Sequence, residues 1–296
     1  MNGATDNDVP VRNAELLQIH LLDNLYSLAG SEHITFQGGT AIRWLHGGMR
    51  FSEDLDFVTH HTPDILDDLL VRLGPRIRNA CIAQFGPGVL EQLPKGKRPE
   101  AVKAFFVFRP QDRRERIAVK VEFEMLAAGH KPQQEHRVLR DLPSIARIIA
   151  SGRLSLPYSS SIIVAETPSQ ILADKVRALY ERNYLKGRDL YDIWWLHSKT
   201  GVSVSWELVR ETFSLYRAPF TAARSWNFFQ KKGSEHELNS ALRTDLSRFI
   251  PSGVYRHYES QGFSEFIEAC KHLSAMLLDQ GMKEYLRHHE SRKGNP

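Results

Sequence analysis

The chain has 296 residues, of which 42% are hydrophobic and 25% are charged, and its formal net charge is +4. These values are typical of a soluble globular protein with one large domain or two modest ones, and they exclude a disordered chain, collagen and a coiled coil. Two cysteines are too few for a disulfide framework or a zinc knuckle. No apolar run reaches membrane-spanning length and no secretory signal is visible, so we expect a cytoplasmic protein.

Charge is unevenly distributed along the chain. Between Arg72 and Lys120 lie twelve basic and four acidic residues, a local charge of +8. Such a stretch is expected in a nucleic-acid-binding protein, but a solvated surface would give the same pattern. Composition therefore leaves nucleic-acid binding as one of two interpretations of this segment.

The first hundred residues alternate between helix-like and strand-like patterns. The spacing predicts helices over 13–28, 40–45 and 63–85 and strands over 34–37 and 54–59. Thr40 is the expected cap of the second helix, after a turn at Gly38 and Gly39. The glycine- and proline-rich stretch over 86–99 is predicted to be a surface loop.

The character of the chain changes near residue 165. Before it, β-rich segments over 102–109 and 116–125 are separated by a polar hairpin connection, and a short strand precedes residue 166. After it, helical patterns cover 169–182, 188–198, 206–216, 237–249 and 264–278. We therefore expect two parts, residues 1–165 and residues 166–296.

Carboxylates gather on two of the predicted strands. Alternation places Asp54 and Asp56 on one strand face, opposite Leu55 and Phe57, and converging carboxylate oxygens suit a hard divalent cation. Glu122 lies on the polar side of a later strand and could join them, since like charges on one sheet face repel unless a cation neutralises them. The alternative is a strand end exposed to water. Glu124 is also available, either at an exposed position or as a partner of Lys120.

A phosphate site is predicted beside the first strand. The turn Gly38-Gly39-Thr40 lies between a strand and a helix, where backbone amides and the helix dipole suit a phosphate, although a double glycine is often only a turn. The hydroxyl of Ser52 could donate to the same phosphate or could cap the local turn.

Lys175 interrupts the apolar stripe of a predicted helix. A buried ammonium needs an anion, which a nucleotide phosphate could supply, unless its stem carries the charge out to water. Asp189 and Asp192 follow in the next helix. Their alternative interpretations are helix-dipole complementarity for Asp189 and an i,i+4 pair with Arg188 for Asp192.

Together these segments resemble a known family. The order QGGTAIRWL, RFSEDLDF, VKVEFE and ADKVRALYERNYLKGRDLYDIWWL, within about residues 35–196, resembles the AbiEii/AbiGii toxin family of bacterial nucleotidyltransferase-like proteins. Its pattern is a G-G-T turn, an R-x-S-x-D-L-D-F strand, a later β carboxylate, K-x-x-A-L, and R-D-x-x-D. The resemblance implies an α/β (α+β) fold with a DNA polymerase β-like nucleotidyltransferase core in residues 1–165 and a helical C-terminal region in 166–296.

The resemblance also implies a role for each matching residue. Asp54 and Asp56 would hold two Mg²⁺ ions, with Glu122 completing the metal site. The triphosphate would be bound by Gly38, Gly39, Thr40, Ser52 and Lys175. Asp189 in the helical region would fill the last motif position of the active site, with Asp192 as the weaker candidate.

By this resemblance the chain is a nucleotidyltransferase toxin of a toxin–antitoxin system. It would transfer a nucleotide from an NTP to RNA, with the tRNA 3′ end preferred, and release pyrophosphate; an antitoxin is a further expected partner and a membrane is not. Two alternatives stay open. One is a metal-dependent nuclease, and the other is a non-catalytic RNA- or partner-binding protein, which the basic stretch and the aromatic residues Trp226, Phe228 and Phe229 would serve.

Overall fold

The computed structural model describes residues 8–156 and 161–290. These residues form two compact units. Unit 1 comprises residues 8–47, 51–128, 134–156 and 161–166, and unit 2 comprises residues 48–50, 129–133 and 167–290. No helix in these described ranges has the length and apolarity that a membrane span requires.

Unit 1 is built on a seven-stranded mixed sheet with the strand order β3-β4-β5-β2-β1-β7-β6. The strands are β1 (Ile34–Gln37), β2 (Asp54–Thr59), β3 (Gly88–Arg98), β4 (Ala101–Pro110), β5 (Ile117–Met125), β6 (Gln134–Val138) and β7 (Ile162–Glu166). The pairs β2–β5 and β1–β7 are parallel, and the other four neighbouring pairs are antiparallel. The sheet and the helices together make an α+β protein, as predicted.

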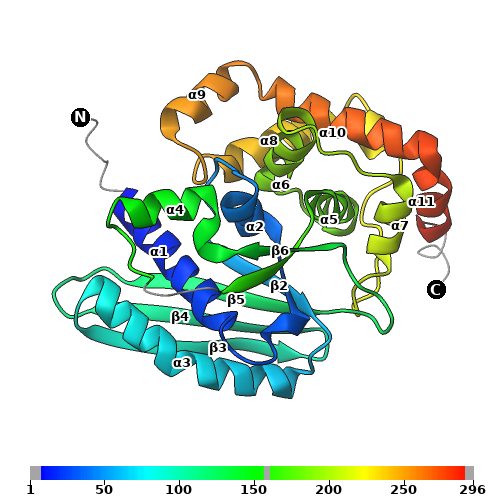
Figure 1. The fold of residues 1–296 in the computed structure, drawn as a ribbon. Helices are drawn as coiled ribbons and strands as arrows, with labels where there is room; N and C mark the ends of the chain where they lie inside the picture. The colour runs from blue at the N-terminus through cyan, green and yellow to red at the C-terminus, as the bar shows by residue number, and fades with distance from the viewer. Residues whose placement is uncertain (1–7, 157–160, 291–296) are drawn as a thin grey trace. The chain divides into compact units, whose positions relative to one another are not determined.

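Strict alternation in β5 explains how the sheet divides apolar from polar side chains. Every second residue from Ile117 to Met125 is buried, and the residues between them are half-buried. The rings of Phe57 and Phe123 stack at 5.2 Å on the apolar side. Helices α1 (Asp8–Leu25) and α3 (Pro63–Phe85) contact each other and strands β3 to β5 (Figure 1). The polar side chains of β2 and β5 consequently share the opposite side of the sheet.

The predicted loop over 86–99 is wrong. That segment is the edge strand β3, which pairs with β4 in antiparallel register from Gly88 to Arg98. Pro94 lies at a register irregularity of this edge strand, where a missing backbone donor is tolerated. Glycine and proline usually indicate a loop, but an edge strand with irregular pairing accommodates both residues. Strand β6 and helix α4 (Pro143–Ala150) also had no counterpart in the sequence prediction.

Unit 2 is mainly helical. Its helices are α5 (Pro168–Glu181), α6 (Gly187–Ile193), α7 (Trp206–Phe213), α8 (Ser234–Leu246), α9 (Ser252–Ser260), α10 (Ser264–Leu277) and α11 (Lys283–Glu290). π-helical segments extend α6 over Trp194–Lys199 and α10 over Leu278–Met282. The five helices predicted after residue 165 are present with slightly shifted ends, whereas α9 and α11 were not predicted.

Candidate active site

The sheet of unit 1 brings charged side chains of three strands into one cluster. Parallel pairing of β2 with β5 places Asp54 opposite Lys120 and Asp56 opposite Glu122. Antiparallel pairing of β4 with β5 places Lys103 opposite Glu122. We call these five residues the carboxylate row. Directly paired residues on neighbouring strands project to the same side of a sheet, so register alone collects three carboxylates and two ammonium groups.

Ion pairs link the members of the carboxylate row. The Lys120 ammonium lies 2.8 Å from Asp54 Oδ2 and 3.2 Å from Glu122 Oε2, and Lys103 pairs with Glu122 Oε1. Burial alone would raise the pKa of Glu122, but Lys103 and Lys120 outweigh burial and lower it. Burial would lower the pKa of Lys120, and its bond to Asp54 raises it instead. Glu122 is therefore held ionised, which metal binding requires.

Asp54 and Asp56 have the chemistry of hard-cation ligands. Their carboxylates share one face of β2, and the side chain of Asp54 is 28% exposed, so solvent and ions reach it. Both oxygens of Glu122 are engaged by lysines. Within the described residues, no three His, Cys, Asp or Glu side chains are arranged to hold a metal ion. The donor set fits a divalent cation at Asp54 and Asp56, and Glu122 could join only by exchanging a lysine partner.

Gly38 makes a close approach to the aspartates possible. Its φ of 79° is a left-handed conformation, and an added Cβ would lie 2.9 Å from Asp56 Oδ2. Any other residue would meet both backbone strain and a clash with that carboxylate. Gly38 and Gly39 form the first turn of α2 (Gly38–Leu45), so their backbone begins this helix directly after β1.

Thr40 is not the helix cap that the sequence predicted. Helix α2 begins two residues earlier, with Gln37 at the cap position. The buried Thr40 hydroxyl instead lies 2.7 Å from Ser52 Oγ and hydrogen-bonds to the carbonyl of Asp54. Thr40 and Ser52 thereby tie the start of α2 to the start of β2. The extended backbone of Gln37 supplies the entry conformation, and Gly38 follows it with a φ of 79°.

A second charged cluster lies in unit 2. The Lys175 ammonium is 2.7 Å from Asp189 Oδ1 and 2.8 Å from Asp192 Oδ2. Arg182 pairs with Asp189 Oδ2, and Arg50 donates two bonds of 2.6 Å to the two oxygens of Asp192. We call these five residues the buried network. It joins a three-residue segment before β2 to helices α5 and α6.

The sequence-based alternatives for Lys175 and Asp192 do not hold, whereas Asp189 does lie in the first turn of α6. Lys175 is buried and pairs with two aspartates, so its stem does not carry the charge to water. Asp192 pairs with Arg50 and Lys175 rather than with Arg188, which approaches Asp245 at 3.9 Å. Sequence reasoning assigned no role to Arg50 or Arg182, although Arg50 is the first residue of the R-x-S-x-D-L-D-F motif. A buried aspartate requires a cation, but the sequence did not indicate which one.

Electrostatics in the buried network favours the charged forms. Burial would raise the pKa of Asp192, but Arg50 and Lys175 lower it below its ordinary value. Burial would likewise raise the pKa of Asp189, and Arg182 and Lys175 hold it well below the usual range. For Lys175, burial would lower the pKa and the two aspartates raise it. Three cations face two carboxylates in this named set, and Asp245 adds a further attraction on Arg50.

Part of the basic stretch in unit 1 is neutralised locally. Lys97 lies 2.7 Å from Asp64 and 2.6 Å from Asp67, both on α3. Arg109 pairs with Glu91 at 3.2 Å, and Lys103 and Lys120 belong to the carboxylate row. The excess of cations seen in the sequence therefore overstates the charge offered to a partner.

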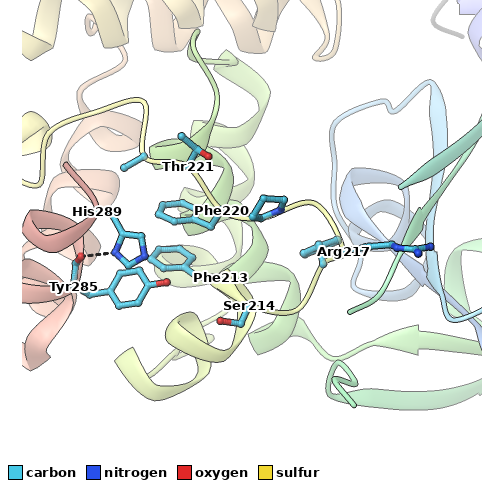
Figure 2. A pocket seen from close by; sticks show the side chains of 10 residues that line it. Phe213, Ser214, Arg217, Phe220, Thr221, Tyr285 and His289 are labelled. Carbon is cyan, nitrogen blue, oxygen red and sulfur yellow. Dashed lines mark hydrogen bonds between the residues drawn. The ribbon is translucent and has the colours of Figure 1, made fainter. Parts of the chain in front are cut away.

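The remaining aromatic features are largely structural. Phe229 is fully buried and packs edge-on against Tyr180 at 5.4 Å, so it is not available as an exposed RNA contact. A hollow of about 530 Å³ in unit 2 contains two ring pairs, Phe213–Phe220 and Tyr285–His289, each stacked at 4.1 Å (Figure 2). The two rings of each pair stack on each other and leave no gap between them. No residue with a predicted role lines the hollow.

The mixed sheet, the paired aspartates on β2 and the adjoining Gly-Gly turn together define a protein of the nucleotidyltransferase class. The chain belongs to the family described as "Nucleotidyl transferase AbiEii toxin, Type IV TA system", whose model matches residues 20–268. This confirms the predicted resemblance. No curated protein matches the chain.

Solved structures share the fold. A Helicobacter pylori protein described as a "putative nucleotidyltransferase" superposes with a TM-score of 0.51 at 19% identity, covering 94% of this chain and 98% of its own. JHP933 from Helicobacter pylori superposes with a TM-score of 0.51 at 18% identity, covering 99% of this chain and 100% of its own. At such identities the similarity concerns the fold, and it confirms the predicted nucleotidyltransferase architecture.

Proposed function

We propose that this protein is a Mg²⁺-dependent nucleotidyltransferase toxin that transfers a nucleotide from an NTP to RNA, with the 3′ end of tRNA as the preferred acceptor. The observation that carries the proposal is the carboxylate row, in which the sheet register of a family member gathers Asp54, Asp56 and Glu122. In this reaction a ribose hydroxyl attacks the α-phosphate in line, and pyrophosphate leaves.

Asp54 and Asp56 hold the divalent cations in this proposal, and two Mg²⁺ ions are expected. When bound, such cations lower the pKa of the attacking hydroxyl and stabilise charge on the leaving oxygen. Glu122 completes the set after exchanging a lysine for a metal ion. Lys103 and Lys120 keep the three carboxylates from repelling one another while the metal is absent.

The proposal assigns the phosphates of the NTP to backbone amides, a hydroxyl and an ammonium of the chain. Gly38 and Gly39, at the start of α2, contribute backbone amides, and Ser52 contributes its hydroxyl, which Thr40 positions. Lys175 neutralises the triphosphate. Asp189 positions the Lys175 ammonium and shares this task with Asp192. The matching family model spans both clusters, which supports assigning them to one reaction.

Membership of a type IV toxin–antitoxin family supports an antitoxin as a protein partner. We place the activity in the cytoplasm, where NTPs and tRNA are found.

The test is incubation of the purified chain with Mg²⁺, total RNA and each of the four labelled NTPs, followed by mass spectrometry of the RNA. Label on intact RNA, lost in an Asp54→Ala variant, is the expected result. RNA fragments formed without NTP would instead identify a nuclease. Absence of both label and Mg²⁺-dependent NTP binding would identify a non-catalytic binding protein.

A further inference from the structure

A hollow beside the buried network has no role in the function proposed above. Its volume is about 870 Å³, and it lies between helix α8 and residues 183–188, which form the loop before α6 and the first two residues of α6. We call it the α8 cleft. Tyr184, Lys186 and Arg188 line one side, and the exposed Ser240 and Thr244 lie on the helix side. The cleft lies wholly within unit 2.

The start of α6 packs against α8 through a close backbone contact at Gly187. A Cβ added to Gly187 would lie 2.6 Å from the carbonyl oxygen of Ala241 and 2.8 Å from Leu242 Cα. Only glycine permits this approach, so the residues on either side of Gly187 have a defined position beside the helix. The backbone amide of Arg188 also donates to Asp245 at 3.1 Å. The cleft is therefore a built feature of the fold rather than a gap beside a loose loop.

Lys186 is a half-buried cation without a matching anion. Among the described residues it makes no ion pair with a carboxylate, although it lines the cleft with Glu237 and Asp245. Glu237 pairs with Arg224 at 3.7 Å, and Asp245 pairs with Arg188. The oxygens of Asp189 are engaged by the buried network. Each of these carboxylates already has a cation.

The neighbourhood of Lys186 is electrostatically positive. Burial, together with repulsion from Arg182, Arg188 and Lys175, lowers its pKa to about 8 against the attraction of Asp189. The charged form of an ammonium in such a position is destabilised in the free protein. A bound anion stabilises that charged form. A phosphate group is an anion of suitable size and charge.

Tyr184 adds a stacking surface next to this cation. Its side chain is one of the few large rings on the surface, with 64% exposed, and the Lys186 ammonium lies 5.9 Å from the ring centroid. Exposed aromatic rings beside a cation are a usual means of holding single-stranded nucleic acid, because bases stack on the ring while the cation contacts the backbone. The cleft volume is at the upper end of small-ligand sites and accommodates more than one phosphate-linked unit.

We infer that the α8 cleft binds the single-stranded end of the RNA acceptor, with Lys186 contacting a backbone phosphate and Tyr184 stacking on a base. This inference rests on the proposed function, because it concerns the acceptor of the same reaction. It assigns the acceptor to unit 2, whereas the charge distribution of the sequence pointed to the basic stretch in unit 1.

The test measures RNA binding directly, without catalysis. The full chain is titrated into a fluorescein-labelled single-stranded RNA 12-mer, without NTP, over a range of salt concentrations. Lys186→Met should weaken binding about tenfold and lower the salt slope by about one unit. Tyr184→Leu should weaken binding about tenfold, and Tyr184→Phe, which keeps the ring, should bind as the unmodified chain does.

The matched control is Lys199→Met, because Lys199 is a lysine of unit 2 that has a carboxylate partner, Glu265, at 3.4 Å. It should leave RNA binding unchanged. Thermal unfolding and calorimetric titration with each NTP accompany every variant. The expected pattern is a fall in RNA affinity in Lys186→Met and Tyr184→Leu, with stability and NTP affinity retained.

Three results would overturn the inference. Unchanged RNA affinity in both variants would show that Lys186 is a solvated cation and Tyr184 an incidental surface ring. Reduced NTP affinity with unchanged RNA affinity would assign the cleft to the triphosphate. A chain that binds NTP and transfers nucleotides but binds no RNA would also exclude this inference, whereas a chain that neither binds NTP nor transfers nucleotides would contradict the proposed function itself.

Discussion

The carboxylate row and the buried network are built from the same kinds of charges but in different environments. In the row, the side chain of Asp54 is 28% exposed and that of Lys120 is 19% exposed. In the network, those of Asp192 and Arg50 are only 1% and 4% exposed. The row lies on a sheet surface, where ions can exchange with solvent, whereas the network is enclosed among helices except at Arg182, whose side chain is 37% exposed.

This difference in exposure predicts different roles for the two clusters. Exposed ion pairs contribute little to stability and are readily replaced by another cation. Breaking a buried pair leaves an uncompensated charge in a medium that cannot solvate it, which costs several kcal/mol. The row can therefore exchange lysines for metal ions, while the network fixes the position of Lys175. The following predictions test that division.

The largest expected effect is loss of transfer in Asp54→Ala and Asp56→Ala. Loss of several kcal/mol of charge stabilisation corresponds to a fall of about a thousandfold in turnover. The free energy of unfolding should change by less than about 1 kcal/mol for Asp54→Ala, because a partly exposed ion pair is removed together with carboxylate repulsion. Turnover and urea unfolding measured on the same samples check both statements. A folded variant with near-normal turnover would contradict the assignment of the carboxylate row to the active site.

Arg50→Met should have the largest effect on stability. It leaves Asp192 without two hydrogen bonds of 2.6 Å, and the expected loss is about 3 kcal/mol. Urea unfolding monitored by circular dichroism measures it. The control is Arg109→Gln, which breaks an exposed pair with Glu91 and should leave the midpoint unchanged. Equal effects of the two substitutions would contradict the distinction between exposed and buried clusters.

Lys175→Met should lower both stability and NTP affinity. Methionine keeps much of the packing of the stem and removes the charge, so Asp189 and Asp192 retain only their arginine partners. We expect a loss of about 2 kcal/mol in the free energy of unfolding, smaller than for Arg50→Met. Calorimetric titration with NTP on the folded variant gives the second readout. Undiminished NTP affinity would leave Lys175 with a purely structural role.

The sequence predicted part of the carboxylate row. Alternation along a strand was sufficient to place Asp54 and Asp56 on one face, since side chains alternate with a period of two. It could not show that Lys120, on the same face of β5, lies opposite Asp54, because strand register is set by long-range pairing. Sequence reasoning considered Glu124 as a partner of Lys120, and the structure pairs Lys120 with Asp54 and Glu122.

Lys120→Met should strengthen binding of a divalent cation in the absence of NTP. The substitution frees Asp54 and one oxygen of Glu122 from an ammonium, and an effect of about 1 kcal/mol corresponds to about a fivefold lower Kd. Electron paramagnetic resonance with Mn²⁺ measures the affinity and the number of bound ions. Lys97→Met is the control, since Lys97 is a paired lysine of the same sheet outside the row. Weaker Mn²⁺ binding in Lys120→Met would contradict the exchange of lysine for metal.

The smallest expected effect concerns the connection between β4 and β5. Arg113, Arg114 and Arg116 are exposed, and Arg113 already approaches Asp112 at 3.7 Å. Replacing all three with Gln should weaken RNA binding modestly and lower the salt slope by about one unit for each phosphate that an arginine no longer neutralises, with NTP binding unchanged. Comparison with Lys186→Met then shows which unit holds more of the RNA. An unchanged slope would mean that this connection is only a solvated surface.

By itself, the sequence determined the alternation of the strands, most of the helices and the motif order that identifies the family. These features are local, because a strand face or a helix face is defined by residues two to four positions apart. The same local reasoning failed for β3, where proline and glycine indicated a loop and sheet-edge pairing produced a strand.

Only the tertiary structure decided which charges meet. Arg50 and Asp192 are 142 residues apart in the sequence and form a bidentate pair in the buried network with two bonds of 2.6 Å. Coulomb attraction depends on distance in space and on the dielectric environment, and neither is encoded by spacing along the chain. The same limit applies to Lys186, which makes no carboxylate ion pair among the described residues because the fold pairs Asp189, Asp245 and Glu237 with other cations.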